Sequence, residues 1–259
     1  MQLPLYQIDA FAGKPFEGNP AAVCPLEEWL PDDLMQAIAA ENNLAETAFF
    51  TASENGYHIR WFTPTTEVKL CGHATLASAY VLFHLLGYNK PQITFDSLSG
   101  PLRVRQDGEW LELDFPAQPP RPCDTPASIV AAFGQTPVAC LRAEDYIVVF
   151  DEEALVREAQ PDLARLRQLD LRGVAITAAG REQDFVCRFF APNYGIDEDP
   201  VTGSAYTQLA PYWGKVMNKT ELYARQVSSR GGNVKCRLDG NRVAIAGQAV
   251  KFLEGRIEI

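Results

Sequence analysis

Short runs of alternating apolar and polar residues recur along most of the chain and predict β-strands. Two pairs of runs flank the turn signals "SENG" and "DGE", namely "AETAFF" with "YHIRWF" and "LRVRQ" with "WLELDF", and predict two hairpins. Further strands are predicted in "YQIDAF" near the start, and in "RVAIAG" and "KFLEGRIEI" near the end. The pattern indicates a sheet-rich protein with few long helices.

Two segments have helical spacing instead. In residues 30–42, Pro31 suits a first turn, two aspartates follow it, and Leu34 and Ile38 are one helical turn apart. In residues 72–87, "GHATLASAYVLFHLLG", apolar residues surround the helix almost completely. A helix that is apolar all round belongs in a core, so we expect sheets to wrap this one.

The segment "NNLAETAFF", residues 42–50, reads as a strand with a carboxylate in its middle. Leu44, Glu46, Ala48 and Phe50 share one face because side chains alternate along a strand. An ionised glutamate on an apolar face is costly, so we expect Glu46 to have a use there. The alternative is an edge strand from which Glu46 points to solvent.

An internal repeat flanks the proline-rich segment at residues 115–126. "RWFTPTTEVKLCGHATLASAY" starts at Arg60 and "RFFAPNYGIDEDPVTGSAYTQLA" starts at Arg188, and Gly72 and Gly203 occupy matching places at the helix starts. Matching order, spacing and linker position favour two half-length copies of one unit over a chance match between ordinary strand-loop-helix segments.

The two glycines also have a chemical meaning. The first N–H groups of a helix lack partners within it and carry the positive end of its dipole, so each helix start is a potential site for a carboxylate or oxyanion. Taken alone, a glycine before a helix is more simply a tight turn. The repeat makes the anion-site interpretation stronger.

Composition and net charge limit the classes of molecule that the protein is expected to bind. The chain has 259 residues, of which 47% are hydrophobic, and a net charge of -10. An acidic protein is poorly suited to nucleic acid or an anionic membrane, so a small molecule is the expected partner. The start resembles no signal peptide and no apolar run spans a bilayer, which predicts a cytoplasmic protein.

No cofactor or metal is expected. Six cysteines are scattered without a CxxC pair, which favours free thiols, and the three histidines lack zinc-site spacing. No nucleotide-binding fingerprint is present.

The motifs "FEGNPAAV", "NNLAETAFF", "RWFTPTTEVKLCGHATLASAYVL" and "GIDEDPVTGSAYTQLAPYW" occur in this order. Together they resemble the PhzF-like (phenazine biosynthesis-like) isomerases, relatives of diaminopimelate epimerase. The resemblance implies an α+β fold of two pseudo-symmetric domains, each a curved mixed sheet around a central helix, with the active site between them. We place these domains at residues 1–117 and 118–259, and leave open whether a strand at 250–259 joins the first domain, as in related folds.

The resemblance also implies site residues. Glu46 corresponds to the family's general acid/base, and burial is expected to raise its pKa toward the neutral range. Gly72 and His73 in "GHAT", and Asp199 and Ser204 in "DPVTGSA", correspond to family site residues.

Their expected roles leave alternatives. His73 would donate to the substrate or shuttle protons. Asp199 would orient His73, bind a substrate amine or hydroxyl, or simply accept N–H groups in its turn. Ser204 would supply a hydroxyl, Gly203 a helix-start N–H, and Asn19 either a contact with the substrate or a turn.

One departure bears on the chemistry. Racemases of the wider superfamily use two opposed cysteines, and the matching positions here hold Cys71 and Thr202. A threonine hydroxyl is too weakly acidic to replace a thiol, which disfavours a two-cysteine racemase. Cys71 is then a small buried residue, unless it works with Glu46.

The expected function is a cofactor-independent isomerase that moves a proton within a small carboxylate-bearing substrate by glutamate acid/base catalysis. The family's named example acts on a dihydro-hydroxyanthranilate in a biosynthetic process, and relatives often form homodimers. The alternatives are an amino or hydroxy acid racemase or epimerase that uses Cys71, and a non-catalytic metabolite-binding protein.

Overall fold

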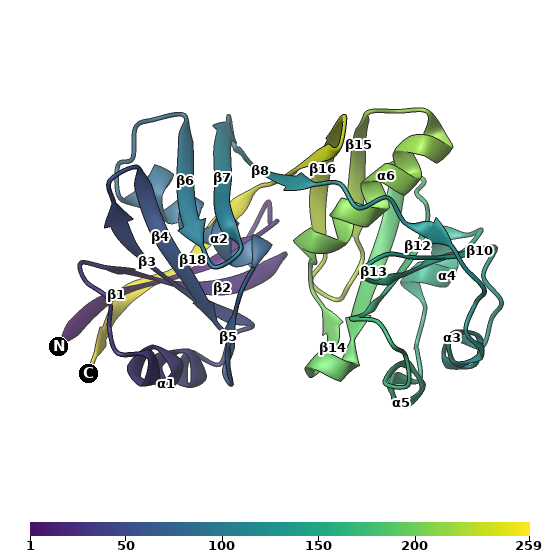
Figure 1. The fold of residues 1–259 in the computed structure, drawn as a ribbon, viewed down its shortest axis with the longest axis horizontal. Coiled ribbons are helices and arrows are strands. Elements are labelled where there is room, and N and C mark those ends of the chain that lie inside the picture. The colour runs from purple at the N-terminus through teal and green to yellow at the C-terminus, as the bar shows by residue number, and fades with distance from the viewer. The chain divides into compact units, whose positions relative to one another are not determined.

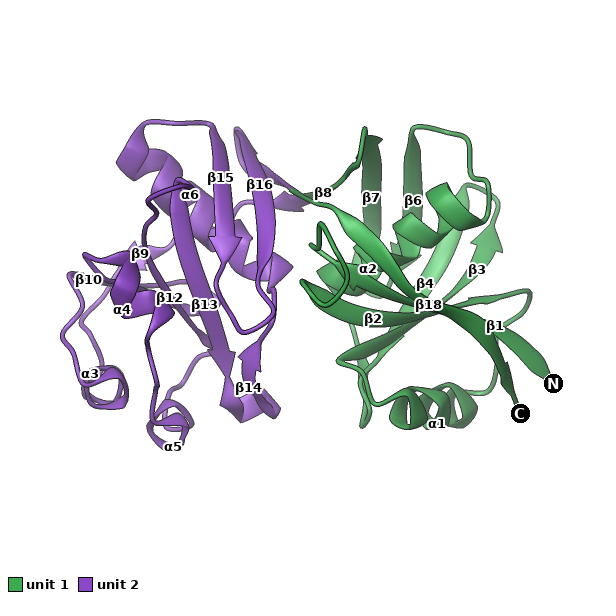
Figure 2. Cartoon of the chain, turned by 180° about the vertical axis from the view of Figure 1, so that it is seen from behind, with its two compact units in different colours: residues 1–114, 246–259 green, residues 115–245 purple.

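The computed structural model describes residues 1–259 and divides into two compact units. Unit 1 comprises Met1–Asp114 and Ala246–Ile259, and unit 2 comprises Phe115–Ile245 (Figure 2). The chain passes into unit 2 within strand β8 (Trp110–Pro116) and returns within β17 (Arg242–Gly247).

Unit 1 is a mixed sheet around one buried helix (Figure 1). Along the sheet, β18 pairs antiparallel with β1, β1 antiparallel with β2, β2 parallel with β3, and β3 antiparallel with β4. Strand β4 pairs parallel with β6 and antiparallel with the short β5, β6 pairs antiparallel with β7, and β7 with β8. The strands are β1 (Gln2–Ala10), β2 (Asn19–Leu26), β3 (Glu46–Ser53), β4 (Gly56–Phe62), β5 (Glu67–Val68), β6 (Gln92–Ser97), β7 (Gly100–Asp107) and β18 (Ala249–Glu258).

Helix α2 (Gly72–Tyr80), continued by a π-helical turn, η1 (Val81–Leu85), is the core helix that its all-round apolar sequence predicts. It packs against β1, β2 and β3. Helix α1 (Asp32–Asn42) packs on β3 and β4 and buries Met35 and Ile38. Strand β3 therefore has a helix packed on it from the core and another from outside.

The strand predicted from Asn42 begins instead at Glu46. Helix α1 runs to Asn42, and Asn43 ends it in the left-handed conformation (φ 49°), with its N–H donating to the carbonyl of Ala39. Glu46 is thus the first residue of β3, not a residue in its middle. Ala48 and Phe50 follow Glu46 on the same face of the strand, as predicted, but residues 47–51 are all buried, so both faces of β3 are covered.

Unit 2 repeats the sheet of unit 1. Its β10–β11, β11–β12, β12–β13, β13–β14, β13–β15 and β15–β16 pairs have the same orientations as the corresponding pairs from β1–β2 to β6–β7. Its strands are β9 (Arg121–Pro122), β10 (Ala139–Arg142), β11 (Tyr146–Val149), β12 (Val174–Ala179), β13 (Phe185–Ala191), β14 (Ile196–Asp199), β15 (Glu221–Gln226) and β16 (Gly232–Asp239).

Helix α6 (Tyr206–Met217) packs on β15 and β16, as a counterpart of α2. Helices α3 (Ala127–Phe133), α4 (Glu153–Arg157) and α5 (Leu163–Leu166) contribute to a separate buried cluster with β11, β12 and β13. Two 3-10 turns, η2 (Pro192–Tyr194) and η3 (Gly203–Ala205), complete the unit. None of the helices combines the length and the apolar character that a membrane span requires.

The two arginines that open the repeats share two contacts. Arg60 makes a bidentate ion pair with Glu67 of β5, and Arg188 makes one with Glu198 of β14. Each guanidinium also lies 5.1 Å from the ring of the phenylalanine two residues further on. Identical contacts at matching positions confirm the predicted repeat.

The proline-rich segment lies against unit 2. Three of its N–H groups donate to carbonyls of that unit, from Ala117 to Asn241, from Gln118 to Thr207 and from Cys123 to Cys140. Prolines prevent a long ladder of hydrogen bonds here, and the two-residue β9 is all the strand that forms.

Candidate active site

Three side chains meet where α2 begins. Glu46 opens β3, Cys71 is the extended residue before α2, and His73 is the second residue of the helix. Nε2 of His73 lies 3.0 Å from Oε2 of Glu46, and Nδ1 lies 3.5 Å from Sγ of Cys71. The imidazole therefore bridges a thiol and a carboxylate.

The Glu46–His73 pair is buried and otherwise unpartnered. The side chains are 13% and 8% exposed, and neither Oε2 nor Nε2 has a hydrogen-bonding partner in the chain beyond this mutual contact. Buried polar groups normally have hydrogen-bonding partners, and leaving them without costs free energy. Oε2 keeps acceptor capacity for a further hydrogen bond, for example from a ligand, whereas the single N–H at Nε2 is used in the contact with Glu46.

The two residues perturb each other's protonation. Burial alone raises the pKa of Glu46, but the charge of His73 and hydrogen bonds from His73 and Cys71 lower it below its ordinary value. Burial alone lowers the pKa of His73, but its charge interactions and hydrogen bonds with Cys71 and Glu46 raise it well above the ordinary value. Burial therefore acts on Glu46 in the expected direction, but the expected net rise of its pKa is wrong. Both shifts favour the charged forms, a carboxylate beside an imidazolium.

Cys71 belongs to this cluster. Burial and the negative charge of Glu46 raise the pKa of its thiol, so it is protonated at neutral pH. Of the two roles the sequence left open, contact with the acid/base pair is the one observed. The signal was the spacing in "CGH", which places a thiol two residues before the histidine.

Ligand atoms of Glu46, Cys71 and His73 all lie within 4.8 Å of one another, close enough for a metal ion. Their orientation fits a proton relay better. Sγ and the carboxylate oxygen lie beside different nitrogens of the ring, whereas a single metal ion would bind beside one nitrogen.

Asn19 lies beside this cluster along the sheet. It is the fully buried first residue of β2, opposite Ala10, and it precedes by two residues Ala21, the partner of Glu46 in the β2–β3 ladder. Asn19 and Ala21 therefore share a face of the sheet. The turn belongs instead to Gly18 (φ 69°), where a Cβ would lie 2.1 Å from the carbonyl oxygen of Ala10.

In unit 2 a network of hydrogen bonds holds the loop before η3. The hydroxyl of Thr202 donates to Oδ2 of Asp199 (2.5 Å), and the N–H of Thr202 donates to Oε1 of Gln226 (2.9 Å). Nε2 of Gln226 in turn donates to the carbonyl of Asp199 (2.7 Å). The carboxylate of Asp199 thus accepts a hydroxyl within its turn, whereas the expected role was to accept N–H groups there, and that role stays a prediction.

Gln226 was missed by the sequence analysis. It lies at the end of β15, fully buried, and nothing in that strand's sequence distinguishes it. Only the parallel pairing of β13 with β15 brings it to the loop, so no local signal could have found it.

The second helix start differs from the expectation. Gly203 and Ser204 lie in the 3-10 turn η3, and the α-helix begins only at Tyr206. The carbonyl of Ser204 accepts the hydroxyl of Thr207 (2.7 Å). The expected contact between Asp199 and His73 would join residues of different units, and it stays a prediction.

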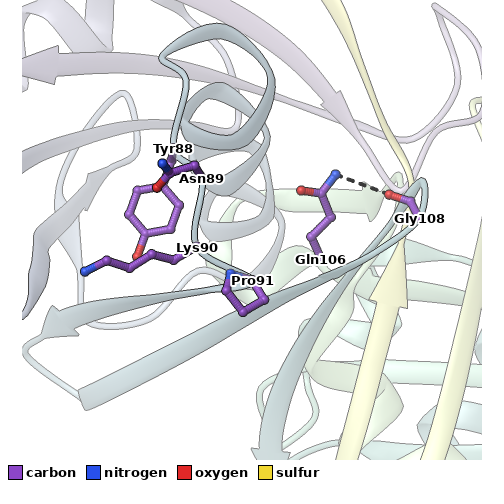
Figure 3. Close-up of a pocket in the computed structure, with 6 residues that line it drawn as sticks. All are labelled: Tyr88, Asn89, Lys90, Pro91, Gln106 and Gly108. Atoms are coloured by element: carbon purple, nitrogen blue, oxygen red, sulfur yellow. Dashed lines mark hydrogen bonds between the residues drawn. The ribbon is translucent and has the colours of Figure 1, made fainter.

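A surface pocket in unit 1 lies apart in sequence from these candidates and holds no carboxylate, histidine or cysteine. On one side of it, Nε2 of Gln106 donates to the carbonyl of Gly108, two residues further along the chain (3.2 Å; Figure 3). It has none of the acid/base groups described above. Its lining residues are Tyr88, Asn89, Lys90, Pro91, Gln106 and Gly108.

Comparison with known proteins supports the family resemblance that the motifs indicate. Residues 8–255 match the family model described as phenazine biosynthesis-like protein. The chain belongs to this family. The family member described as an uncharacterized isomerase in Pseudomonas aeruginosa is 50% identical over 259 residues, with all of both chains covered.

Solved structures agree with this membership. The crystal structure of a phenazine biosynthesis protein of the PhzF family from Enterococcus faecalis matches with a TM-score of 0.98 and 46% identity, over all of both chains. A hydroxyproline epimerase from Agrobacterium vitis matches with a TM-score of 0.61 over 99% of this chain and 92% of that one. At 8% identity the second likeness shows the fold alone. The predicted pair of epimerase-like α+β domains is confirmed.

Proposed function

We propose that this member of the phenazine biosynthesis-like family is a cofactor-independent isomerase that moves a proton within a small carboxylate-bearing substrate. The observation that supports this most directly is the buried Glu46–His73 ion pair, with both facing atoms otherwise unpartnered. A structural ion pair is usually completed by further hydrogen bonds, whereas an acid/base pair needs its atoms available to substrate. The name of the Pseudomonas aeruginosa relative agrees with this class of reaction.

In this proposal Glu46 is the base. As a carboxylate it takes a proton from a substrate carbon, and the electron pair of that C–H bond is delocalised toward the substrate's own unsaturated or carboxyl groups. Glu46, now neutral, returns the proton to a different carbon, so that atoms and charges balance without a co-reactant. The ionised state that His73 maintains at Glu46 is the state needed for the first step.

The positive charge of His73 fits an anionic substrate. An imidazolium in a water-poor site stabilises negative charge that develops on the substrate, and the N–H groups at Gly72 would add donors at the start of α2. From unit 2 we propose that Asp199, Gly203 and Ser204 bind the substrate as well. Asn19, on the face of the sheet next to Glu46, would contact it from β2.

One observation favours a second candidate, a racemase or epimerase that uses Cys71. Its thiol lies 3.5 Å from His73, so the cluster contains a second proton carrier. Against it, the raised pKa keeps the thiol protonated, and Thr202, at the matching position of unit 2, donates its hydroxyl to Asp199. A non-catalytic metabolite-binding protein would have no need of the acid/base pair.

The test is proton NMR in deuterated buffer with a panel of small cyclic and acyclic amino and hydroxy carboxylates. We expect deuterium uptake by particular substrates in the native protein and in Cys71→Ser, and none in Glu46→Gln. Inversion at one carbon that disappears in Cys71→Ser would favour the racemase instead. Line broadening that shows binding, with no uptake in any protein, would favour the binding protein and refute catalysis.

A further inference from the structure

Two cysteines lie together in unit 2, apart in sequence from the candidate catalytic groups. Sγ of Cys123, in the proline-rich segment, lies 3.7 Å from Sγ of Cys140 in β10. The N–H of Cys123 donates to the carbonyl of Cys140 (3.0 Å). The other four cysteines are buried, and none is within hydrogen-bonding distance of another sulfur.

The pairing of strands places these residues directly opposite each other. Strands β9 and β10 are antiparallel, with Arg121 opposite Arg142 and Pro122 opposite Leu141, so the next pair in register is Cys123 with Cys140. Opposite residues that share a backbone hydrogen bond have Cα atoms about 5.5 Å apart. Disulfides span Cα separations of about 4.4–6.8 Å, so the backbone is already at a suitable distance.

The sulfurs are too far apart to be bonded and close enough to become so. A disulfide bond is about 2.05 Å long. The two Sγ atoms would have to approach by less than 2 Å from their 3.7 Å separation, which rotations about side-chain bonds can supply. Neither strand needs to move.

We propose that Cys123 and Cys140 are a thiol-modification site that forms a reversible disulfide with a small-molecule disulfide, such as oxidised glutathione, as oxidant. Cys123 is half-buried, and Cys140 is 5% exposed. The more accessible Cys123 thiolate attacks the oxidant, one small thiol leaves, and a mixed disulfide forms. The thiolate of Cys140 then attacks Sγ of Cys123 and releases the second thiol. Two electrons pass to the oxidant and two protons leave the protein side chains.

The order of attack follows from burial. Burial and the neighbouring thiol of Cys123 raise the pKa of Cys140 to about 12, so this thiol is a poor first nucleophile. Next to a mixed disulfide at Cys123 it needs only an intramolecular attack. The product would join the proline-rich segment covalently to β10.

The experiment treats the folded, full-length protein with oxidised glutathione and maps disulfides by mass spectrometry after non-reducing digestion. The expected product is one linkage, Cys123 to Cys140, that reduced glutathione reverses. In Cys140→Ser we expect a stable glutathione adduct on Cys123, and in Cys123→Ser no adduct on Cys140. Cys24→Ser, which removes a buried cysteine of unit 1, is the matched control and should form the same linkage.

Circular dichroism on each variant ensures that folded proteins are compared. The proposal is overturned if the folded native protein stays fully reduced while the urea-unfolded chain oxidises, or if a different pair forms. Neither readout uses enzymatic activity, so the result is independent of the proposed isomerase function.

Discussion

Replacing Glu46 by Gln tests whether the buried pair is charged. The carboxylate oxygen and Nε2 of His73 are 3.0 Å apart. Unit charges at that separation attract by roughly 5–6 kcal/mol at an effective dielectric constant of about 20. Desolvation of the imidazolium offsets part of this attraction, and we expect Glu46→Gln to lower the pKa of His73.

The same change predicts a dependence of stability on pH. The raised pKa of His73 contributes stability that is complete below its ordinary value of 6.5 and is lost as pH rises through the folded-state value. The lowered pKa of Glu46 contributes stability above its ordinary value of 4.5 and loses it as pH falls through the folded-state value. Glu46→Gln should therefore destabilise the protein between these two ordinary values, by less than the roughly 5–6 kcal/mol of attraction because desolvation offsets part of it. The loss should shrink in alkaline solution.

Imidazole NMR measures the first quantity and urea unfolding at several pH values measures the second. The spectrum of His73→Gln assigns the His73 signal among the three histidines. Glu54→Gln, an exposed change in the turn after β3, is the control and should alter neither quantity. An unchanged pKa of His73 in Glu46→Gln, or a loss of stability in alkaline solution equal to that between pH 4.5 and 6.5, would refute the charged pair.

Three further predictions concern other contacts. His73→Gln removes the positive charge beside Glu46, so the pKa of Glu46 should rise and the acid limb of the pH profile for deuterium exchange should move to higher pH; an unmoved limb would count against this role of His73. Arg188→Ala should lower the free energy of unfolding, measured in urea, by about 3–5 kcal/mol. The arginine side chain is only 9% exposed, and its removal leaves a carboxylate and three carbonyls without their donor. Arg60→Ala should cost less, because that side chain is 23% exposed. Equal losses would contradict this ranking. We also propose that the protein is a homodimer through β18, which pairs only with β1 and leaves Phe252 47% exposed; light scattering should then show a dimer that Phe252→Glu converts to monomer, and a native monomer would refute it.

Much of the fold was predictable because its signals are local. The all-round apolar sequence after Gly72 predicts a core helix, and turn residues between alternating runs predict hairpins, since each depends on neighbours in the sequence. The repeat was visible in the sequence because each copy keeps the residues that make these shared contacts, among them Arg60 and Arg188. The end of α1 at Asn42 was predicted, but the next strand was begun there as well, whereas a left-handed Asn43 and two further residues separate the helix from β3.

The residues of the candidate site could be predicted from the sequence better than their protonation could. The motifs brought Glu46 and His73 forward, but the direction of the pKa shift depends on a 3.0 Å approach between residues 27 positions apart in the sequence. Burial alone points the other way, and only the observed contact decides between the two effects. Gln226 shows the same limit, because its role comes entirely from the pairing of distant strands.

The position of β18 has a consequence for how the protein is made. This strand completes the sheet of unit 1 beside β1, yet in the sequence it follows all of unit 2. Unit 2 is continuous, so it can fold on the ribosome as soon as it has emerged. The first-synthesised part of unit 1 must wait with the edge of β1 uncovered until β18 arrives. During translation, therefore, the unit that is begun first is the one that is finished last.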